Sequence, residues 1–363
     1  ARGLATDEGL MARYASGPSA PTLRLYTYRS HCALVGRFQD AAAELDLEAC
    51  ERTGTQVNRR PTGGGAIVMG RDQIGLALVA SLSDPITPPH ARAMIARFGE
   101  GIVRGLARLG IDGEVRGKND VAVRGRKIAG LGVYTDVHDA VLFHASVLVD
   151  LDVPFMLSVL NVPVAKLADK AVASVRERIT TVRAETGSAV ETGEIRRVIE
   201  AGYQESFGIG LENDVLDEAD RSETGALIAR RYGRPGWVHS RTSGAPQGTS
   251  ILKTPGGLLR IAVRLSGEAI EDVLVGGDFM AGDRAVAELE AALRWVAADR
   301  TRVEEAVKLG FARGGGLERV SDTELSEALW QAVLDARSRR GATGSCYYPA
   351  VTSAASDATV VRG

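Results

Sequence analysis

Arg59-Arg60-Pro61-Thr62-Gly63-Gly64-Gly65-Ala66 is the most informative stretch of the chain, and it follows a short run that begins at Val57. The run predicts a strand, and the three consecutive glycines expose backbone N–H groups that no Cβ atom shields. Such a loop can wrap closely around an anion, and the two arginines supply positive charge. No Gly-Lys-Ser/Thr follows, so this is not a P-loop, and the dinucleotide fingerprint is absent. On the glycines alone a flexible turn is the simpler interpretation, and a phosphate or carboxylate loop is the alternative.

A second motif lies on a predicted β-hairpin. Gly117-Lys118-Asn119-Asp120 leads through a tight turn to Gly125-Arg126-Lys127-Ile128-Ala129-Gly130. Asp120 is a candidate Mg²⁺ ligand because hard cations prefer carboxylate oxygens. Lys127, near the small residues Ala129 and Gly130, could point into a pocket as a compact cationic donor. A solvated, charged hairpin is the competing interpretation; it is favoured for Arg124 and Arg126, and both interpretations stay open for Lys127.

A histidine stands inside a third stretch, the strongly β-forming run Val141-Leu142-Phe143-His144-Ala145-Ser146-Val147-Leu148-Val149. A histidine within an apolar strand is usually a core residue whose hydrogen bonds are satisfied. The residues of this strand alone therefore assign no function to His144.

Together these stretches resemble the lipoate–protein ligase family, which forms a larger group with biotin–protein ligases and octanoyltransferases. The glycine loop is similar to the family's Arg-Arg-x-Ser/Thr-Gly-Gly-Gly-Ala motif, and the hairpin to its Asn-Asp…Lys-Ile-Ser/Ala-Gly motif. The strand from Phe143 to Asp150 resembles the strand that follows. The segment from Ala173 to Thr180 resembles the Ser-Val-x-x-Arg segment that the family folds over an adenylate. Four motifs in one order are far more specific than any one of them.

The resemblance implies an ATP-dependent, AMP-forming lipoate–protein ligase. Lipoate would be activated with ATP and Mg²⁺ to a lipoyl-adenylate, and the lipoyl group would then pass to a lysine of a lipoyl carrier domain. Lys127 is the implied catalytic residue, which stabilises charge at the reacting oxygens, and Asp120 is the implied metal ligand. The implied binding residues are Arg59, Arg60, Thr62, Gly63, Gly64, Gly65, Ala66, Asn119, Asp120, Lys127, Ala129, Gly130, His144, Ala145 and Ser146. The implied carriers are the acyltransferase subunits of 2-oxoacid dehydrogenases, the glycine-cleavage carrier protein and related lipoate-binding proteins.

The chain departs from the family pattern at Val68-Met69-Gly70, where many members have a histidine shortly after the glycines. This departure leaves the details of the lipoate pocket and the preferred acyl chain open. Two other functions also stay open. One is an octanoyl- or lipoyl-transferase that works between carrier proteins without ATP, and the other is a non-catalytic, ligand-binding member of the fold. Transferases of the group use a cysteine nucleophile, and the segment from Lys127 to Phe207 contains none.

The composition is that of an ordinary globular protein of about two domains. Of the 363 residues, 45% are hydrophobic and 25% are charged, and the formal net charge is -2. Such a balance argues against nucleic-acid binding. No apolar run is long enough to span a membrane, and the first residues show no signal peptide. Three scattered cysteines fit a reducing compartment, so we expect a cytoplasmic protein without membrane or nucleic-acid partners, and a monomer.

The order of the predicted elements, together with the resemblance, indicates a mixed α/β (α+β) fold. Residues 1–245 are expected to form a catalytic domain with a largely antiparallel sheet flanked by helices, as in biotin and lipoate ligases. A small α+β accessory domain is expected over residues 246–340, where Gly277-Asp278-Phe279 resembles a motif of bacterial lipoate ligases. Residues 341–363 are expected to be a mobile tail. Helices are predicted over residues 90–109, 194–207, 217–232 and 283–297.

Overall fold

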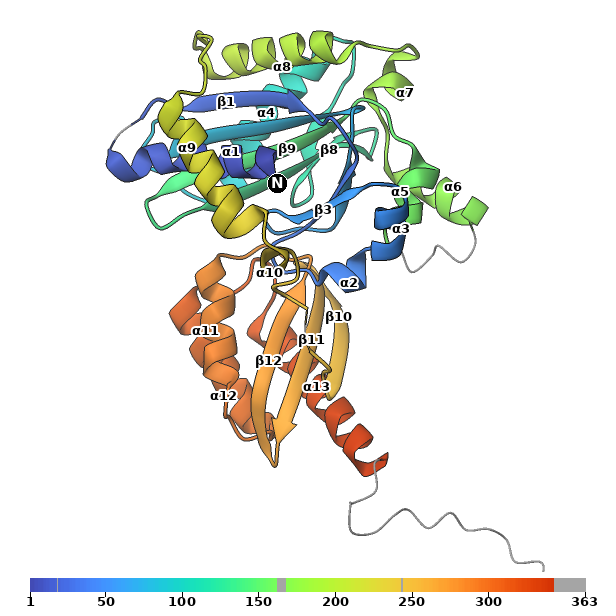
Figure 1. The fold of residues 1–363 in the computed structure, drawn as a ribbon, viewed down its shortest axis with the longest axis vertical. Helices are drawn as coiled ribbons and strands as arrows, with labels where there is room; N and C mark the ends of the chain where they lie inside the picture. Colours follow the sequence, from blue (N-terminus) through green and yellow to red (C-terminus); the bar gives the residue numbers. More distant parts are fainter. Residues whose placement is uncertain (18, 162–167, 243, 343–363) are drawn as a thin grey trace, which may run out of the picture.

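The structure is a computed structural model that describes residues 1–17, 19–161, 168–242 and 244–342. An N-terminal and a C-terminal part follow one another along the long axis of the molecule (Figure 1). The helical elements of the N-terminal part are α1 (Arg2–Met11), the 3₁₀ turn η1 (Ala12–Ser16), α2 (Ala41–Glu44), α3 (Leu47–Arg52), α4 (Ala91–Ala107), α5 (Val153–Val159), α6 (Ala168–Arg178), α7 (Val182–Thr186), α8 (Thr192–Phe207), α9 (Glu218–Leu227), the π turn η2 (Ile228–Tyr232) and α10 (Pro235–Val238). Its strands are β1 (Thr22–Thr27), β2 (Cys32–Val35), β3 (Gln56–Arg59), β4 (Ile67–Met69), β5 (Gln73–Ser81), β6 (Glu114–Arg116), β7 (Asp120–Val123), β8 (Arg126–Thr135) and β9 (Ala140–Leu148).

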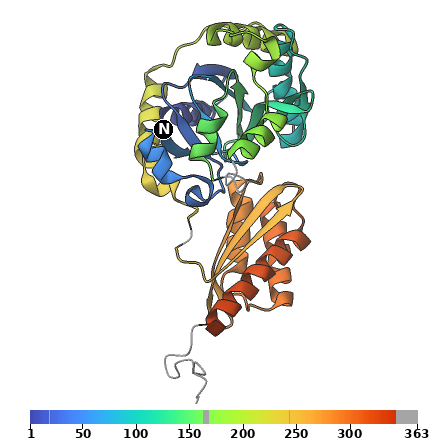
Figure 2. The ribbon, with the colours of Figure 1, turned by 90° about the vertical axis from the view of Figure 1, so that its right-hand side faces the viewer.

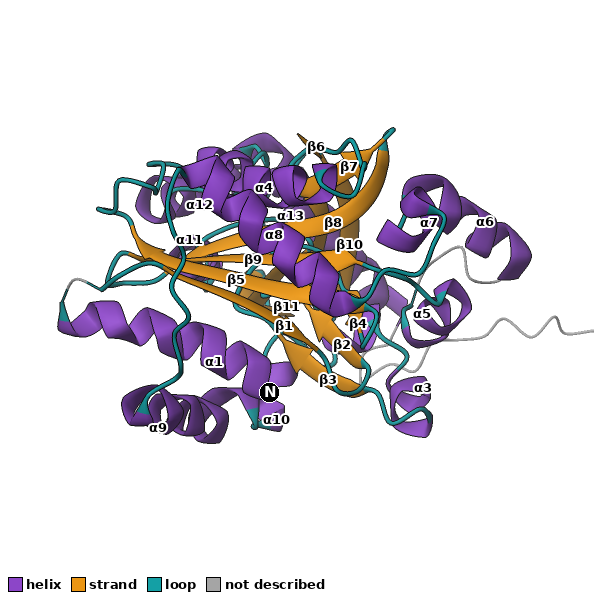
Figure 3. Ribbon diagram, turned by 90° about the horizontal axis from the view of Figure 1, so that it is seen from above, coloured by secondary structure: helices purple, strands orange, loops and turns teal. Residues whose placement is uncertain are grey.

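A six-stranded antiparallel sheet forms the centre of the N-terminal part, in the order β1-β5-β9-β8-β7-β6. Strand β5 lies between β1 and β9, and its side chains, which point alternately to the two faces of the sheet, are buried on both. Ile74, Leu76 and Leu78 join the core formed with α4 and α8, whereas Ala77 and Val79 pack with Leu10 and Met11 of α1. Figure 3 shows the helices on both sides of these strands. This arrangement confirms the predicted mixed fold with a largely antiparallel sheet flanked by helices.

A second, three-stranded sheet carries the glycine loop. Its order is β3-β2-β4, with β2 parallel to β3 and antiparallel to β4. Because β3 ends at Arg59 and β4 begins at Ile67, the loop over residues 60–66 connects two strands that lie on opposite sides of β2. The short chain between them must therefore cross the end of β2, which is where the glycines lie.

The C-terminal part consists of an antiparallel sheet in the order β10-β11-β12 and three helices. Its elements are β10 (Gly248–Thr254), β11 (Gly257–Ser266), β12 (Ala269–Gly277), α11 (Asp283–Leu293), α12 (Arg300–Gly314) and α13 (Asp322–Ala342). Alternate residues of β11, such as Leu259, Ile261 and Val263, are buried in the core that α11, α12 and α13 complete. Figure 2 shows this part as a layer of helices against one sheet.

The two parts contact each other next to the glycine loop. Phe38 stacks on Phe279 with ring centroids 5.2 Å apart, and the Gly277 N–H donates to the Phe38 carbonyl at 2.9 Å. Arg37 pairs with Asp283 at the start of α11, at 2.7 Å. Phe38 is consequently the one residue of the N-terminal part within the described core of the C-terminal part.

Two predicted helices end earlier in the structure than the sequence indicates. The α-helix α9 ends at Leu227, and the residues from Ile228 to Tyr232 form the π turn η2. α11 stops at Leu293 because the chain turns back at Trp295, whose φ is +61°, and the Val296 carbonyl accepts the Ile270 N–H. No helix in the described part of the chain combines the length and apolar character needed to cross a bilayer. The predicted tail lies outside the described residues from position 343 onward, and the boundary near residue 245 stays a prediction.

Candidate functional site

A cavity lies between the glycine loop and the strands β1, β2, β4, β8 and β9. Its lining has three kinds of residue. The apolar and aromatic ones are Leu4, Tyr26, Tyr28, Leu34, Ile67, Met69 and Leu131. The polar ones are Arg60, Thr62, Asn119, Lys127, His144 and Ser146, and the small ones are Gly65, Ala66, Gly130, Gly132 and Ala145. An apolar wall with convergent cationic groups suits an amphipathic anion, with an apolar body and a charged head.

The glycine loop closes around the side chain of Arg60. This guanidinium is buried and donates to the carbonyls of Leu34 at 3.1 Å, Gly63 at 2.9 Å and Gly65 at 2.7 Å. Burial lowers the pKa of Arg60 to about 10, so the group stays charged at neutral pH. Among the ion pairs of the described residues, none gives Arg60 a carboxylate partner. A buried cation without a counter-ion at the rim of a cavity favours an anionic ligand.

A β-bulge turns Lys127 into the cavity. Ala129 pairs with Val121 and Lys127 with Ala122, so Ile128 is the extra residue on β8. A bulge re-aims the side chains beyond it, and it places Lys127 on the same face as Gly130. A Cβ atom at Gly130 would stand 3.1 Å from Lys127 Nζ and 3.4 Å from Ser146 Oγ. The absence of a side chain at Gly130 therefore leaves the room that the ammonium group occupies.

Asp120 forms an ion pair with Lys127. Its Oδ1 atom lies 2.7 Å from Lys127 Nζ, and the two side chains are about one-third exposed. An ammonium group has three donors, so the ion pair with Asp120 leaves donors of Lys127 for a ligand. Asn119 is fixed next to this pair because its side-chain amide donates to the Leu131 carbonyl at 3.1 Å.

His144 is oriented by a carboxylate that the sequence did not indicate. Its Nε2 lies 3.1 Å from Asp7 of α1, a residue with no exposed surface. Asp7 also accepts hydrogen bonds from Tyr26 at 3.0 Å and from Arg24. Because a carboxylate only accepts hydrogen bonds, Nε2 carries a proton, and Nδ1 is the ring nitrogen that does not face Asp7. Burial alone would raise the pKa of Asp7, but Arg24 and His144 outweigh it, and this pKa lies below its ordinary value.

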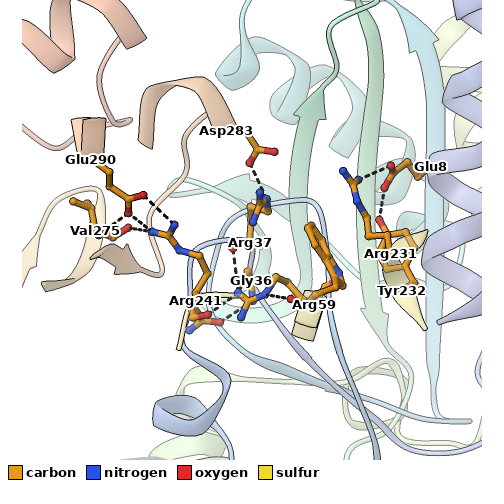
Figure 4. Close-up of polar contacts among 12 residues, drawn as sticks. Glu8, Gly36, Arg37, Arg59, Arg231, Tyr232, Arg241, Val275, Asp283 and Glu290 are labelled. Carbon is orange, nitrogen blue, oxygen red and sulfur yellow. Dashed lines mark hydrogen bonds and ion pairs between the residues drawn. The ribbon is translucent and has the colours of Figure 1, made fainter. Parts of the chain in front are cut away.

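Arg59 points away from the cavity. Its guanidinium donates to the carbonyl of Gly36 at 2.8 Å (Figure 4). It also donates to the carbonyls of Gln39 at 2.6 Å and Val238 at 2.7 Å. Burial lowers the pKa of Arg59 to about 9, and the charge is satisfied by main-chain oxygens. Arg59 therefore ties the turn after β2 to the segment that leads into the C-terminal part.

The structure thus separates the predicted site residues into two groups. The cavity brings together Arg60, Thr62, Gly65, Ala66, Asn119, Lys127, Gly130, His144, Ala145 and Ser146. Its lining does not include Arg59, Gly63, Gly64, Asp120 or Ala129. Gly63 and Gly64 instead face the C-terminal part, where the Gly64 N–H donates to the Phe279 carbonyl at 3.4 Å. Tyr26 of β1 and Tyr28, just after this strand, line the cavity although the sequence analysis did not select them; their i, i+2 spacing was the available signal.

The apolar wall and the cationic groups of the cavity suit an amphipathic anion, and the comparison with known families is specific. Residues 1–204 match the family described as Lipoyl protein ligase A/B catalytic domain. The match covers more than half of the chain, which therefore belongs to this family.

Two relatives cover similar lengths but have different names. Octanoyltransferase LipM of Kyrpidia tusciae is 29% identical over 249 residues, which are 62% of this chain and 90% of the relative. Lipoate-protein ligase A subunit 1 of Thermoplasma acidophilum is 30% identical over 243 residues, which are 64% of this chain and 90% of the relative. Each relative is matched over nearly its whole length, and about a third of this chain has no counterpart in it.

Three solved structures are similar to this chain. The bi-partite lipoate protein ligase of T. acidophilum, described with its E2 lipoyl domain, has a TM-score of 0.59 at 29% identity and covers 67% of this chain and 92% of its own. A lipoate-protein ligase A bound with ATP has a TM-score of 0.56 at 28% identity, with 66% and 93% covered. Plasmodium falciparum LipL1 in complex with lipoate has a TM-score of 0.66 over 92% of this chain and 96% of its own. At 15% identity this last likeness shows the fold alone, and it extends over both parts.

Proposed function

We propose that the chain is an ATP-dependent ligase that converts lipoate to lipoyl-adenylate and transfers the lipoyl group to a lysine of a carrier domain. The observation that carries the proposal is a cavity with cationic groups and no cysteine in its lining within the described residues. Cys32 and Cys50 are buried, and burial raises the pKa of Cys32 to about 11 and that of Cys50 above its ordinary value. The thiolate is the reactive form of cysteine, so neither is suited to carry an acyl group.

The cavity residues fit the two chemical steps. A carboxylate oxygen of lipoate attacks the α-phosphorus of ATP, and pyrophosphate leaves. The ammonium group of Lys127 and the buried charge of Arg60 stabilise the negative charge that develops on the phosphate and carboxylate oxygens. In the second step the amine of the carrier lysine attacks the acyl carbon, and AMP leaves. The same cations stabilise AMP as the leaving group, while the apolar wall holds the acyl chain.

Mg²⁺ belongs to this proposal only as an ion carried by ATP. The described residues contain no group of three or more His, Cys, Asp or Glu side chains that could hold a metal. Mg²⁺ commonly keeps several waters and takes one or two carboxylates together with substrate phosphates. Asp120 is the available carboxylate beside Lys127, and bound Mg²⁺ would neutralise charge on the phosphates.

The division of the chain is part of the same proposal. We assign residues 1–245 to the catalytic domain and residues 246–340 to an accessory domain. The assignment is supported by the separate core of the C-terminal part and by the likeness of fold over 92% of the chain to a protein described as a lipoate complex. The carrier is proposed to be a lipoyl domain, since the related T. acidophilum ligase is described together with one.

Octanoyl or lipoyl transfer between carriers without ATP is the second candidate. It is favoured by the names of several relatives, among them Octanoyltransferase LipM of K. tusciae. Such a transferase needs a nucleophile that holds the acyl group, and the family's transferases use cysteine. This chain has no cysteine between Cys50 and Cys346, and Cys346 lies outside the described residues.

Exchange of labelled pyrophosphate into ATP separates the two candidates. The ligase is expected to exchange only when lipoate is present, because exchange requires reversible adenylate formation. Alkylation of the cysteines should leave this rate unchanged. An enzyme that transfers octanoyl groups between carriers, shows no exchange and is inactivated by alkylation would establish the second candidate.

Gly64→Ala is expected to weaken binding of a non-hydrolysable lipoyl-adenylate analogue by about tenfold, which corresponds to about 1.4 kcal/mol. The φ of Gly64 is +95°, and a Cβ atom would stand 3.0 Å from Arg60 Nη2, the group that closes the loop. Calorimetric titration of the folded variant measures the effect.

Gly117→Ala is the matched control. Gly117 has φ +68° with no atom within 4 Å of a Cβ, so both variants should lose about 1–2 kcal/mol of folding free energy from left-handed backbone. Only Gly64→Ala should lose affinity. Equal affinities in the two variants would show that the closed form of the loop around Arg60 does not contribute to binding.

A further inference from the structure

A buried carboxylate outside the cavity joins three segments of the chain. Glu185 lies in α7, and its side chain is only 4% exposed. It accepts hydrogen bonds from Thr180 Oγ1 at 2.6 Å, from Arg126 Nη2 at 2.7 Å and from Arg124. The two arginines belong to the β7–β8 hairpin, and Thr180 follows α6. One anion therefore balances two cations that would otherwise repel each other.

These three segments meet at Lys127. Arg126 is its neighbour in sequence, and the Thr180 N–H donates to the Lys127 carbonyl at 2.8 Å. Lys127 also forms a parallel bridge with Ile179. Its backbone is thus held on one side by Ala122 of β7 and on the other by the segment over residues 179–180.

This support compensates for an interruption in the sheet. The pairing between β8 and β9 begins at Ala129, opposite Val147, so β9 does not reach Lys127. On the other side of β8, the bulge at Ile128 interrupts the ladder directly after Lys127. A bulge leaves its extra residue unpaired and disrupts the ladder locally, so the direction of the Lys127 side chain depends on what else fixes the strand. The segment over residues 179–180 supplies the missing strand neighbour, and Glu185 fastens it to the hairpin.

We propose that Glu185 is a positioning residue for Lys127: it clamps the β7–β8 hairpin to the segment after α6 and thereby keeps the ammonium group aimed into the cavity. The inference rests on the assignment of Lys127 in the proposed function. Glu185 itself does not line the cavity, so its effect passes through Lys127. The effect should appear in the catalytic rate rather than in the binding of the acid.

A double-mutant cycle tests this role. Glu185→Gln keeps the size of the side chain but removes the charge opposite the two arginines. It is expected to lower kcat for lipoate-dependent pyrophosphate exchange by about tenfold, a size typical of coupling between residues in contact, with the KM for lipoate nearly unchanged. In the Lys127→Ala background the same substitution should have almost no further effect. Equal losses in both backgrounds would show that Glu185 only stabilises the fold, and this would overturn the inference.

Further variants keep the test decisive. Glu185→Asp, which restores the charge, should recover part of the rate. Thr180→Val removes one bond to Glu185 and keeps the N–H that bonds to Lys127; it should give a smaller, equally non-additive loss if Glu185→Gln does not fold.

Glu290→Gln is the matched control. Glu290 is 14% exposed and accepts from Arg241 at 2.7 Å and from the Val275 N–H at 2.9 Å, and its effect should be the same with and without Lys127.

The test also distinguishes this inference from the proposed function. If the unaltered protein shows no lipoate-dependent exchange, the proposed ligase activity fails, and the same cycle is then measured on acyl transfer from an octanoylated carrier domain. Non-additive losses in that assay still support Glu185 as the positioning residue, and additive losses still overturn it.

Discussion

Replacing Lys127 by alanine is expected to lower the rate of lipoyl-adenylate formation by about 10²–10³, the usual cost of removing one preorganised charge donor from an active site. Lys127 is the cavity residue whose ammonium group is aimed by a bulge and held at 2.7 Å by Asp120. In the proposed mechanism its removal leaves the developing charge on the phosphate and carboxylate oxygens with only one of the two cations assigned to it, Arg60. The fold should be intact, because the side chain is one-third exposed. Single-turnover formation of the adenylate, followed by quenching and chromatography, measures the loss.

Lys118→Ala is the control for this substitution. Lys118 donates to the carbonyls of Gly256 at 3.0 Å and Asp278 at 3.2 Å in the C-terminal part, and it does not line the cavity. Its removal should change the rate much less than the removal of Lys127. Similar losses in the two variants would mean that the hairpin matters only through its net charge, and a near-normal rate for Lys127→Ala would remove its catalytic assignment.

Asp7→Asn is expected to lower the free energy of unfolding by about 3–5 kcal/mol at neutral pH, the range seen when one partner of a buried ion pair is removed. The Asp7 carboxylate has no exposed surface and accepts from Arg24, Tyr26 and His144. The substitution leaves Arg24 without its counter-charge and weakens the bond that orients His144. Urea unfolding followed by fluorescence measures the loss. Asp214→Asn, at a 65% exposed carboxylate that lies 3.4 Å from Arg13, should cost only about 0–1 kcal/mol.

The effect of Asp7 should also depend on pH in one direction. Its folded-state pKa lies below the ordinary value of 3.8. A carboxyl group with a lowered pKa adds stability above its unfolded-state pKa and loses that contribution as the pH falls through the folded-state value. The difference in stability between the unaltered protein and Asp7→Asn should therefore be constant above about pH 5 and shrink below pH 3.8. A difference that stays the same down to pH 3 would mean that the loss comes from packing rather than charge.

The parts of the site that could be predicted are those that depend on local sequence. The glycines need only a strand before and after them, and the glycine loop of the structure connects β3 to β4 as that pattern indicates. The apolar stripe of α4, with Met94, Phe98, Ile102 and Leu106, also depends only on helical spacing, and all four side chains are buried.

The remaining parts depend on contacts between distant segments. Asp7 meets His144 across 137 positions, and nothing near Asp7 in the sequence indicates that its helix crosses the sheet at that strand. The direction of Arg59 depends on Val238, a residue 179 positions away. The bulge at Ile128 depends on how β7 and β8 pair, and a regular alternation would have placed Lys127 and Gly130 on opposite faces.

The hydrogen bonds of Arg60 fix the direction of peptide groups in the glycine loop before any charge develops on a substrate. In a trans peptide the carbonyl and the N–H point in opposite directions. Because the carbonyls of Gly63 and Gly65 both bond to Arg60, the N–H groups of Gly64 and Ala66 are turned away from this guanidinium. The Gly64 N–H donates to the Phe279 carbonyl at 3.4 Å, whereas Ala66 lines the cavity. The dipoles of these peptides are thus already oriented in the folded protein. In water, a comparable orientation around a new charge has to be created each time, and the energy of that reorganisation is part of the barrier. In a loop whose peptide dipoles are oriented by folding, this reorganisation energy is not needed at the moment of reaction.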